Sequence, residues 1–440
     1  MAGDFNNDGK QDVVVGVSDN NNGTGILYFF RGNGAGSFAT PTQTTSNIPI
    51  AFMLTGDFNN DGNLDVMVGD DGYKFASQGA VFLGDGHGDF KEQALFGQGT
   101  GDFGGPVALG DFNGDGKLDV LYLCEVQGVA ALWVLLGNGD GTFQGPHSVL
   151  SLQNVGGGVG VGDFNGDGRL DVAIGAVSGT NFPPIQIFLG NGDGTFTAGA
   201  LYTAGENSMS AADVNGDGRL DLVFSGTNGT NSGLCVMLGN GDDTFASASC
   251  GDAGGSVLAT ADFNGDGKLD VAATGNPASI YLGNGDGTFQ TPVSLPFSVG
   301  SDVPFGIADF NNDGELDFVF PGTAATLAST VLLQTTLSIS TQSQGFGVHN
   351  VGSTSAQHPV ILTNIGTTRL NITSITITGP DPGDFLEQGK CSTGIRPGGS
   401  CTLKVAFKPT ADGTRTASLS ISYVGIGNPQ NVALSGTGIH

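Results

Sequence analysis

Basic residues are scarce in this chain of 440 residues, which holds 14 Lys and Arg against 42 Asp and Glu and has a formal net charge of −28. Nucleic acids and anionic membranes are bound through clustered Lys and Arg, so this balance argues against both as partners. Long apolar runs are also lacking, and no stretch approaches the roughly 20 apolar residues of a transmembrane helix. We therefore expect no nucleic-acid binding and no membrane insertion.

Histidine is rare too, and the five residues fall in unrelated places, at His87, His147, His349, His358 and His440. No Ser or Cys stands in the context of a nucleophile elbow, and the acids outside the motif described below are too scattered to pair as in a glycosidase. We expect no enzyme, and a polysaccharide-active enzyme is the least favoured alternative.

The chain begins with Met1-Ala2-Gly3-Asp4, which has neither the charged nor the apolar region of a signal peptide. Later copies of the repeated motif follow a longer strand of small residues. We expect the native N-terminus, with any export signal, to lie outside this sequence.

What the chain has instead is a nine-residue motif, D-x-N-x-D-G-x-x-D, that occurs seven times. Ca²⁺ takes six to eight oxygen ligands, and this spacing offers side-chain oxygens at positions 1, 3, 5 and 9 and a backbone carbonyl at position 7. Glycine at position 6 lets the chain double back around an ion. The predicted ligands are Asp4, Asn6, Asp8, Lys10 and Asp12; Asp57, Asn59, Asp61, Asn63 and Asp65; Asp111, Asn113, Asp115, Lys117 and Asp119; Asp163, Asn165, Asp167, Arg169 and Asp171; Asp213, Asn215, Asp217, Arg219 and Asp221; Asp262, Asn264, Asp266, Lys268 and Asp270; and Asp309, Asn311, Asp313, Glu315 and Asp317.

The residues at position 7 would act only through their backbone carbonyls. A single Asp/Asn/Gly cluster is usually a solvated turn, but such a turn requires only one or two of these residues. Seven copies in register favour metal binding, and about seven Ca²⁺ ions would halve the formal negative charge. The motif resembles the first half of an EF-hand, except that its last acid is at position 9 and no helical periodicity flanks it.

The spacing of the motif falls from 54 to 47 residues along the chain, which predicts a propeller or a solenoid built of short strands. Each repeat has a strand of small residues before the motif and a second strand after it. A third strand ends in a glycine turn, such as Leu136 to Phe143, and a fourth follows. Asn-Gly and Asp-Gly in this turn favour a hairpin over a second metal site.

The two motifs in this order, D-F-N-G-D-G-x-x-D and L-G-N-G-D-G-T-F, resemble the FG-GAP/VCBS repeats of integrin α-subunits and of secreted propellers. The resemblance covers residues 1–335. It implies an all-β fold, a seven-bladed β-propeller of four-stranded antiparallel blades that binds calcium, is secreted or on the cell surface, and is expected to be monomeric. The seventh repeat has no glycine turn after residues 330–334, which leaves the closure of the ring open.

Residues 336–440 lack the motif, and apolar and polar residues alternate at Leu403 to Lys408 and at Ser418 to Tyr423. This period of two predicts a β-sandwich. Segments such as Pro397-Gly398-Gly399-Ser400-Cys401 resemble the immunoglobulin-like domain of the abnormal-spindle/hydin type, which implies a spacer or attachment module. Residues 336–340 could instead complete the last blade.

Five cysteines are present. Cys391 and Cys401 bracket a short loop, where a disulfide suits an exported protein better than two buried thiols. Cys235 and Cys250 lie on consecutive strands and could also pair, while Cys124 is interpreted as a small apolar strand residue.

Two functions remain for the repeats. The first is an adhesion-type module that binds an extracellular protein or matrix, and the second is a lectin that binds a glycan between blades, as fungal relatives in the family do. A single Trp and scattered Tyr residues disfavour the lectin. The variable connections at the end of the propeller opposite the motifs form the expected ligand face, with Tyr73, Lys74, Phe75, Phe182, Pro183 and Pro184 as candidate contacts.

Overall fold

The computed structural model describes the chain except for residues 20–21, 71–78, 97–102, 127–128, 146, 153–154, 177–184, 229, 252–255, 264–265, 275–277, 295–305, 313–315, 321–329, 333–336, 342, 365–368, 390, 392–393, 397–398 and 424–428. Within the described part the secondary structure is β-strand, apart from a single 3₁₀ turn, η1 (Pro382–Asp384). Among the described residues, no helix has the length and hydrophobicity that are needed to span a bilayer. The chain divides into two compact units, Met1–Phe310 with Val319–Thr330, and Asn311–Phe318 with Val331–His440.

Seven antiparallel sheets follow one another along the repeats, six with four strands and a seventh with three among the residues described. Sheets 1 to 4 are β1 (Ala2–Gly3), β2 (Asp12–Asp19), β3 (Thr24–Phe30) and β4 (Thr42–Ser46); β5 (Phe52–Gly56), β6 (Asp65–Gly69), β7 (Gly79–Gly84) and β8 (Phe90–Phe96); β9 (Phe103–Gly110), β10 (Asp119–Val126), β11 (Val129–Leu135) and β12 (His147–Leu152); and β13 (Val155–Gly162), β14 (Asp171–Ala176), β15 (Ile185–Gly190) and β16 (Phe196–Tyr202).

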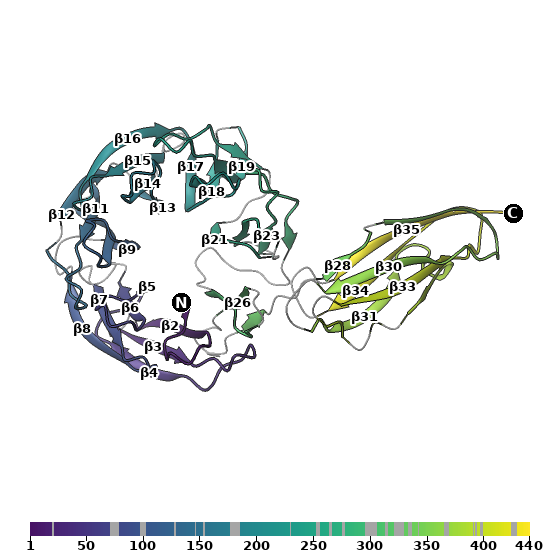
Figure 1. Cartoon of the computed structure of the whole chain (residues 1–440), viewed down its shortest axis with the longest axis horizontal. Helices are drawn as coiled ribbons and strands as arrows, with labels where there is room; N and C mark the ends of the chain where they lie inside the picture. Colours follow the sequence, from purple (N-terminus) through teal and green to yellow (C-terminus); the bar gives the residue numbers. More distant parts are fainter. Residues whose placement is uncertain are drawn as a thin grey trace. The chain divides into compact units, whose positions relative to one another are not determined.

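Sheets 5 to 7 repeat this order. They are β17 (Gly205–Ala212), β18 (Asp221–Thr227), β19 (Ser232–Met237) and β20 (Ser249–Cys250); β21 (Val257–Ala261), β22 (Asp270–Ala273), β23 (Ser279–Tyr281) and β24 (Val293–Ser294); and β25 (Gly306–Ala308), β26 (Asp317–Phe320) and β27 (Thr330–Leu332). Figure 1 shows the sheets side by side around a common centre, with the first strand innermost in the sheets where it is labelled (β5, β9, β13, β17 and β21). Strand β1 of the first sheet lies beside β25 of the seventh.

The second strand of each sheet is buried on both faces over at least its first three residues. In β6, all five residues of Asp65–Gly69 are buried. One face meets sheet 1, where Val66 and Val68 join a cluster with Val14 and Phe29, and the other meets sheet 3, where Met67 lies in a separate cluster. A strand enclosed on both sides needs apolar residues at successive positions, which explains the unbroken Val-Met-Val run. The core of the repeats is thus divided among clusters between neighbouring sheets.

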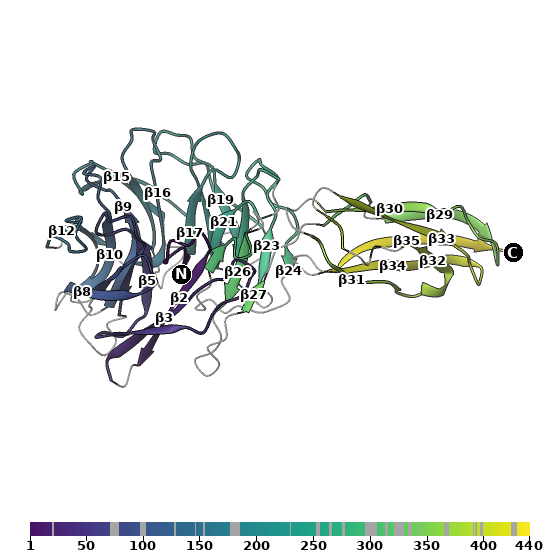
Figure 2. The ribbon, with the colours of Figure 1, turned by 60° about the horizontal axis from the view of Figure 1, so that its bottom comes forward.

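The C-terminal residues form two sheets around one hydrophobic cluster. One sheet contains β28 (Leu337–Ile339), β30 (His358–Asn364), β33 (Ser400–Phe407) and β32 (Phe385–Gln388), and the other contains β29 (Ser343–Asn350), β35 (Gln430–Ile439), β34 (Gly413–Tyr423) and β31 (Ile372–Thr378). Figure 2 shows β34 and β35 running alongside β33. Strand β28 pairs with β30, so the alternative in which residues 336–340 complete the last blade is wrong.

Candidate metal centres

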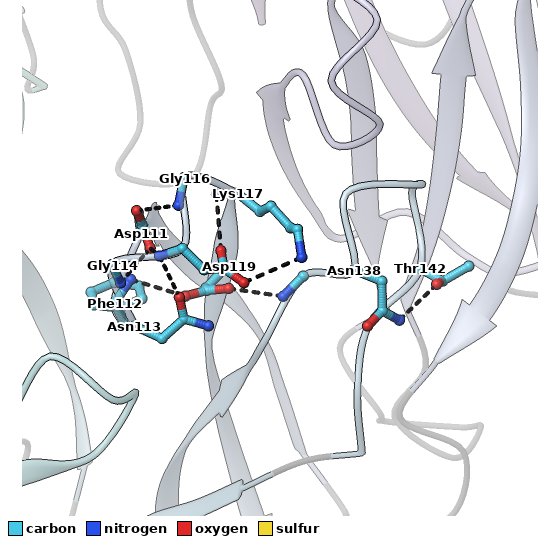
Figure 3. Close-up of polar contacts among 11 residues, drawn as sticks. Asp111, Phe112, Asn113, Gly114, Gly116, Lys117, Asp119, Asn138 and Thr142 are labelled. Carbon is cyan, nitrogen blue, oxygen red and sulfur yellow. Dashed lines mark hydrogen bonds and ion pairs between the residues drawn. The ribbon is translucent and has the colours of Figure 1, made fainter.

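The motifs form the connections between the first and second strands of the sheets, and we number them loop 1 to loop 7. In loop 3, the Asp111 carboxylate accepts the backbone N–H groups of Gly114, Asp115 and Gly116 at 2.7, 3.0 and 2.8 Å (Figure 3). Asn113 Oδ1 accepts the Asp115 N–H at 2.9 Å. The backbone itself therefore orients the oxygens at positions 1 and 3, and loops 1, 2, 4, 5 and 6 show the same bonds from positions 5 and 6 to the first acid.

Two positions of each loop adopt left-handed backbone, wherever the loop is described. Gly116 at position 6 has φ of 80°, and open space surrounds the place where its Cβ would be, so conformation rather than crowding requires glycine. Position 4 is left-handed as well, with φ of 75° at Gly114 and 55° at Asn7. Sequence reasoning missed position 4, although its signal was present: this position is Asn or Gly in all seven motifs.

The acid at position 9 joins the loop to the glycine turn of the same repeat. Asp119 is fully buried, its Oδ2 accepts the Phe112 N–H at 2.9 Å, and its Oδ1 accepts the Gly137 N–H at 2.8 Å. The equivalent pair of bonds is made by Asp12, Asp65, Asp171, Asp221 and Asp270. A residue predicted only as a metal ligand thus also fastens two connections together, a role that sequence reasoning did not predict.

The glycine turns are numbered 1 to 6, and turn 3 (residues 137–143) is representative. A Cβ on Gly137 would lie 2.2 Å from the carbonyl oxygen of Leu118, so the close approach to the loop requires glycine. Within the turn, Asp140 Oδ1 accepts both the N–H and the O–H of Thr142, at 3.0 and 2.5 Å. These hydrogen bonds hold the pKa of Asp140 below its ordinary value. The turn carboxylate already has protein partners, which favours the hairpin interpretation over a second metal site.

Each loop concentrates negative charge near its buried acid. Burial raises the pKa of Asp12, Asp65 and Asp270 to about 6, and the carboxylates at positions 5 and 1 of the same loop act in the same direction, against the backbone N–H donors. The pKa values of Asp119 and Asp221 are raised for the same reasons, and that of Asp171 is raised by burial together with the carboxylates of Asp243 and Asp167. A cation in the loop would relieve this repulsion.

A basic side chain at position 7 supplies part of that relief in four loops. Lys117 Nζ lies 3.3 Å from Asp115 Oδ2, and Lys10, Arg169 and Arg219 make longer pairs with the acid at position 5, at 3.7, 3.9 and 3.9 Å. These charges are about one-third to one-half exposed, so their attraction is weak. The sequence did not predict this contact, because the backbone carbonyl at position 7 was the expected ligand.

The donor set fits Ca²⁺ by its chemistry. Loop 3 offers three carboxylates and an amide oxygen, all hard oxygen donors, within nine residues. Within the described ranges, however, no group of three or more His, Cys, Asp or Glu side chains is close enough to hold a metal ion. Of the five ligands expected in each loop, one is an amide oxygen and one is a backbone carbonyl oxygen. The carboxylate at position 9, which is Asp119 in loop 3, directs both of its oxygens toward backbone N–H groups.

Some of the predicted residues cannot be placed. Asn264, Asp313 and Glu315 lie outside the described residues, and so do all six candidate ligand contacts, Tyr73, Lys74, Phe75, Phe182, Pro183 and Pro184. Both expected cysteine pairs are disulfides, Cys235–Cys250 and Cys391–Cys401.

Comparison with known families gives a match to the FG-GAP-like repeat at residues 4–68, 57–122, 125–174, 175–224, 213–273 and 262–320. The chain belongs to the FG-GAP-like repeat family. C-terminal to the FG-GAP-like repeats, residues 335–437 match the Ig-like domain of the HYDIN/CFA65/VesB-like type. Both resemblances inferred from the motifs are thereby confirmed.

Curated relatives share part of the repeat region. Cartilage acidic protein 1 of Mus musculus is 35% identical over 152 residues, which are 31% of this chain and 22% of that protein. Integrin alpha-PS3 of Drosophila melanogaster is 34% identical over 92 residues, 19% of this chain and 8% of that protein. The chain therefore spans less than a quarter of either relative. Among solved structures, a fungal alcohol oxidase in complex with copper aligns over 99% of this chain and 96% of its own, at 12% identity and a TM-score of 0.41, too weak a likeness to bear on function.

Proposed function

We propose that the FG-GAP-like repeats form a closed, seven-bladed, calcium-binding β-propeller that serves as an interaction module outside the cell. The observation that carries this proposal is the recurrence of one loop-and-turn unit. In each repeat with a described turn, an oxygen-rich loop is fastened through a buried acid to that turn.

Closure is supported by a contact between the two ends of the repeat series. Loops 1 to 4 each pack a phenylalanine against the closing phenylalanine of the next repeat's turn, as Phe58 does with Phe143, with ring centroids 6.0 Å apart. Phe310 of loop 7 makes this contact with Phe38 of turn 1, at 5.6 Å. The Gly36 N–H also donates to the Phe310 carbonyl at 3.0 Å, as the Gly141 N–H does to that of Phe58 at 2.9 Å. Repeat 7 thus meets repeat 1 as neighbouring repeats meet each other.

A binding role is supported by the conformation of the loops and by the relatives. Connections with near-identical sequence crowd one end of the sheets and suit a structural role, so partner recognition is assigned to the variable connections at the opposite end. The relatives named for integrin and cartilage point to an extracellular protein or matrix as the partner class. Two disulfides suit the oxidising environment of an exported protein.

Calcium binding is tested by titrating chelator-treated protein with CaCl₂ in a calorimeter and by counting bound metal after dialysis. We expect about seven Ca²⁺ per chain, and fewer in proportion when loops are disabled one at a time by replacing the acid at position 5, as in Asp115→Ala. Protein that takes up no Ca²⁺, or whose uptake ignores these substitutions, would disprove the proposal. Once a partner is known, Ser/Gly replacement of residues 73–75 and 182–184 should abolish its binding without changing the metal content.

A lectin is retained as the second candidate because of a cleft between repeats 5 and 6. The cleft has a volume of about 480 Å³ and is lined by Ser249 and Cys250 from one repeat and by Tyr281, Thr288 and Gln290 from the next. Most of its lining is apolar, and Ser249, Thr288 and Gln290 supply polar groups beside the ring of Tyr281, a combination that suits a small sugar. A glycan array with the wild type and Gln290→Ala tests this function: loss of a glycan signal in the variant supports it, and an array without any signal rejects it.

A further inference from the structure

The outer strands of repeats 2 and 4 each end in an aromatic residue that packs against the following repeat. Phe96 at the end of β8 meets Phe143 edge to face, with ring centroids 5.3 Å apart, and Tyr202 at the end of β16 meets Phe245 at 5.9 Å. Phe143 and Phe245 are the closing phenylalanines of turns 3 and 5. Since edge-to-face pairs are favourable, each outer ring helps to close the gap between its own repeat and the next.

The Tyr202 ring also brings a polar group into this gap. Its hydroxyl oxygen accepts the backbone N–H of Phe245 at 2.7 Å. The backbone hydrogen bonds that close turn 5 use the Thr244 carbonyl and the Ala246 N–H, so the N–H of Phe245 is left for a group from outside the turn. A phenol therefore matches both the ring and the N–H that a closing phenylalanine presents.

The corresponding position in repeat 5 is Gly251, directly after β20. Phe96 and Tyr202 each pair with the residue four places before the leucine that precedes the next glycine turn. In repeat 5 that residue is Leu234, whose carbonyl accepts the Gly251 N–H at 2.9 Å. A Cβ on Gly251 would meet no atom closer than 4.0 Å. Space that a ring fills in repeats 2 and 4 is therefore open beside repeat 6.

Phe289, which closes turn 6, lines the cleft at this opening and is partly buried. Loop 5 has Val214 where loops 1 to 4 have phenylalanine. Among the described residues, Phe289 is consequently the one closing phenylalanine of the six turns that contacts no other aromatic ring. Its N–H donates to no group in that part of the chain either. Both features that Tyr202 satisfies one repeat earlier are thus without a partner here.

We propose that the cleft between repeats 5 and 6 binds one phenolic ring, the tyrosine side chain of an extracellular partner protein. The ring takes the place that Tyr202 takes one repeat earlier, with its edge or face against Phe289 and its hydroxyl oxygen on the Phe289 N–H. This inference rests on the interaction role proposed above and adds an anchor for the partner. Tyrosine suits such an anchor because it buries a large apolar ring beside one polar group.

The lining of the cleft favours a phenol over a sugar. A sugar carries several hydroxyl groups, and each of them needs a hydrogen-bond partner when it leaves water. Most of the lining is apolar, with polar side chains at Ser249, Thr288 and Gln290. A ring with a single hydroxyl group asks less of such a surface.

The test uses N-acetyl-L-tyrosinamide as the probe and the full chain in calcium, with binding followed by saturation-transfer NMR. We expect a dissociation constant in the millimolar range, as suits a single side chain. N-acetyl-L-phenylalaninamide, which lacks the hydroxyl group, should bind about five- to tenfold more weakly, because the Phe289 N–H then loses its acceptor.

Gly251→Tyr gives repeat 5 the ring that repeat 4 has at Tyr202. It should abolish binding of the probe and raise the melting temperature of the repeats, because the new ring fills the cleft. Gly145→Tyr is the matched control: Gly145 is also surrounded by open space but lies in repeat 3, so its variant should bind like the wild type. Phe289→Leu, which keeps an apolar side chain but removes the ring, is a second variant and should weaken binding several-fold.

A wild type that does not bind the tyrosine probe, or a folded Gly251→Tyr variant that still binds it, would overturn the inference. Binding of methyl glycosides in place of the probe would assign the cleft to the lectin function and overturn it as well. Calcium counted on the same samples separates the two proposals. A wild type that takes up Ca²⁺ and ignores the probe loses this inference alone, whereas one that binds the probe without Ca²⁺ loses only the proposed calcium sites.

Discussion

The repeats and the C-terminal sandwich both bury aspartates, and they compensate the buried charge in different ways. In the sandwich, Asp384 is 2% exposed, but Arg415 Nε donates to it at 2.5 Å and Thr410 Oγ1 at 2.6 Å. Although burial alone would raise its pKa, these partners hold the pKa of Asp384 below its ordinary value. In the repeats, Asp119 is fully buried with backbone N–H donors, and burial raises its pKa. The sandwich pairs its buried acid with a basic side chain, whereas the hydrogen bonds described for Asp119 come from backbone N–H groups, an arrangement that suits the cation proposed above.

The hydrophobic cores of the two regions also differ, because one is self-contained and the other is divided between neighbouring sheets. The sandwich surrounds one cluster that includes Leu403, Phe407 and Leu419. The repeats have separate clusters between neighbouring sheets, so each sheet depends on the two beside it. Because of this difference, removal of metal should lower the stability of the repeats as a group and leave the stability of the sandwich unchanged. The single Trp, Trp133 on β11, makes this measurable, because its fluorescence reports on the repeats alone.

The largest expected effect is that of chelation. Each bound ion at a hundredfold excess over its dissociation constant contributes about 2.7 kcal/mol, so the loss of several ions should lower the melting temperature of the repeats by more than about ten degrees. Trp fluorescence should follow this shift, while the sandwich transition, seen by circular dichroism, stays in place. Equal shifts in the melting temperatures of the repeats and the sandwich would contradict the expectation that only the repeats depend on metal.

The next largest effect is expected from the buried acid of a loop. Asp119→Ala leaves the N–H groups of Phe112 and Gly137 without their acceptor, at a cost of about 1–3 kcal/mol for each buried donor. It should therefore destabilise the repeats even in excess chelator. Asp115→Ala, which changes an exposed residue of the same loop, should lower stability only when calcium is present. Denaturant unfolding followed by Trp fluorescence compares the two variants, and identical behaviour would contradict the dual role of Asp119.

A smaller effect is predicted for the sandwich at low pH. Because the pKa of Asp384 is lower in the folded state than in the unfolded chain, its contribution to stability is fully present above the unfolded value of about 3.9 and is lost as the pH falls through the folded pKa. Asp384→Asn should cost about 2 kcal/mol at neutral pH and flatten this acid dependence. Circular dichroism of the sandwich transition at several pH values measures it, with the exposed Asp412→Asn as control. A variant with the wild-type pH profile would refute the pairing.

The smallest effect should follow from Lys117→Gln. The pair with Asp115 is about one-third exposed, so the change in unfolding free energy should stay below about 0.5 kcal/mol. Calcium stoichiometry should not change, because the lysine would bind the ion through its backbone. A lost site would mean that the side chain has a larger role than the geometry indicates.

Much of this architecture could be predicted from the sequence because it repeats. The two motifs in fixed order gave the strands, the loops and the hairpins, and their family is confirmed. Alternation in the C-terminal residues predicted the sandwich. The pairing of β28 with β30 could not be foreseen, because a short strand such as Leu337–Ile339 suits either neighbouring sheet equally well by pattern alone.

The contacts between connections were beyond sequence reasoning for a physical reason. The bond from Gly137 to Asp119 joins residues 18 apart, and the contact from Gly141 to Phe58 joins neighbouring repeats. Motif spacing reports on local geometry but not on which distant groups meet.

The placement of the turns has a consequence for how the ions bind together. Turn 3 donates through Gly141 to loop 2 and through Gly137 to loop 3, so a single hairpin is shared by two successive loops. Under the calcium binding proposed above, an ion that orders one loop would lower the entropy that the next loop must lose, and this effect would pass from repeat to repeat. Calcium uptake should therefore be cooperative, with a Hill coefficient above one, and the repeats should respond to extracellular calcium over a narrower concentration range than independent loops would.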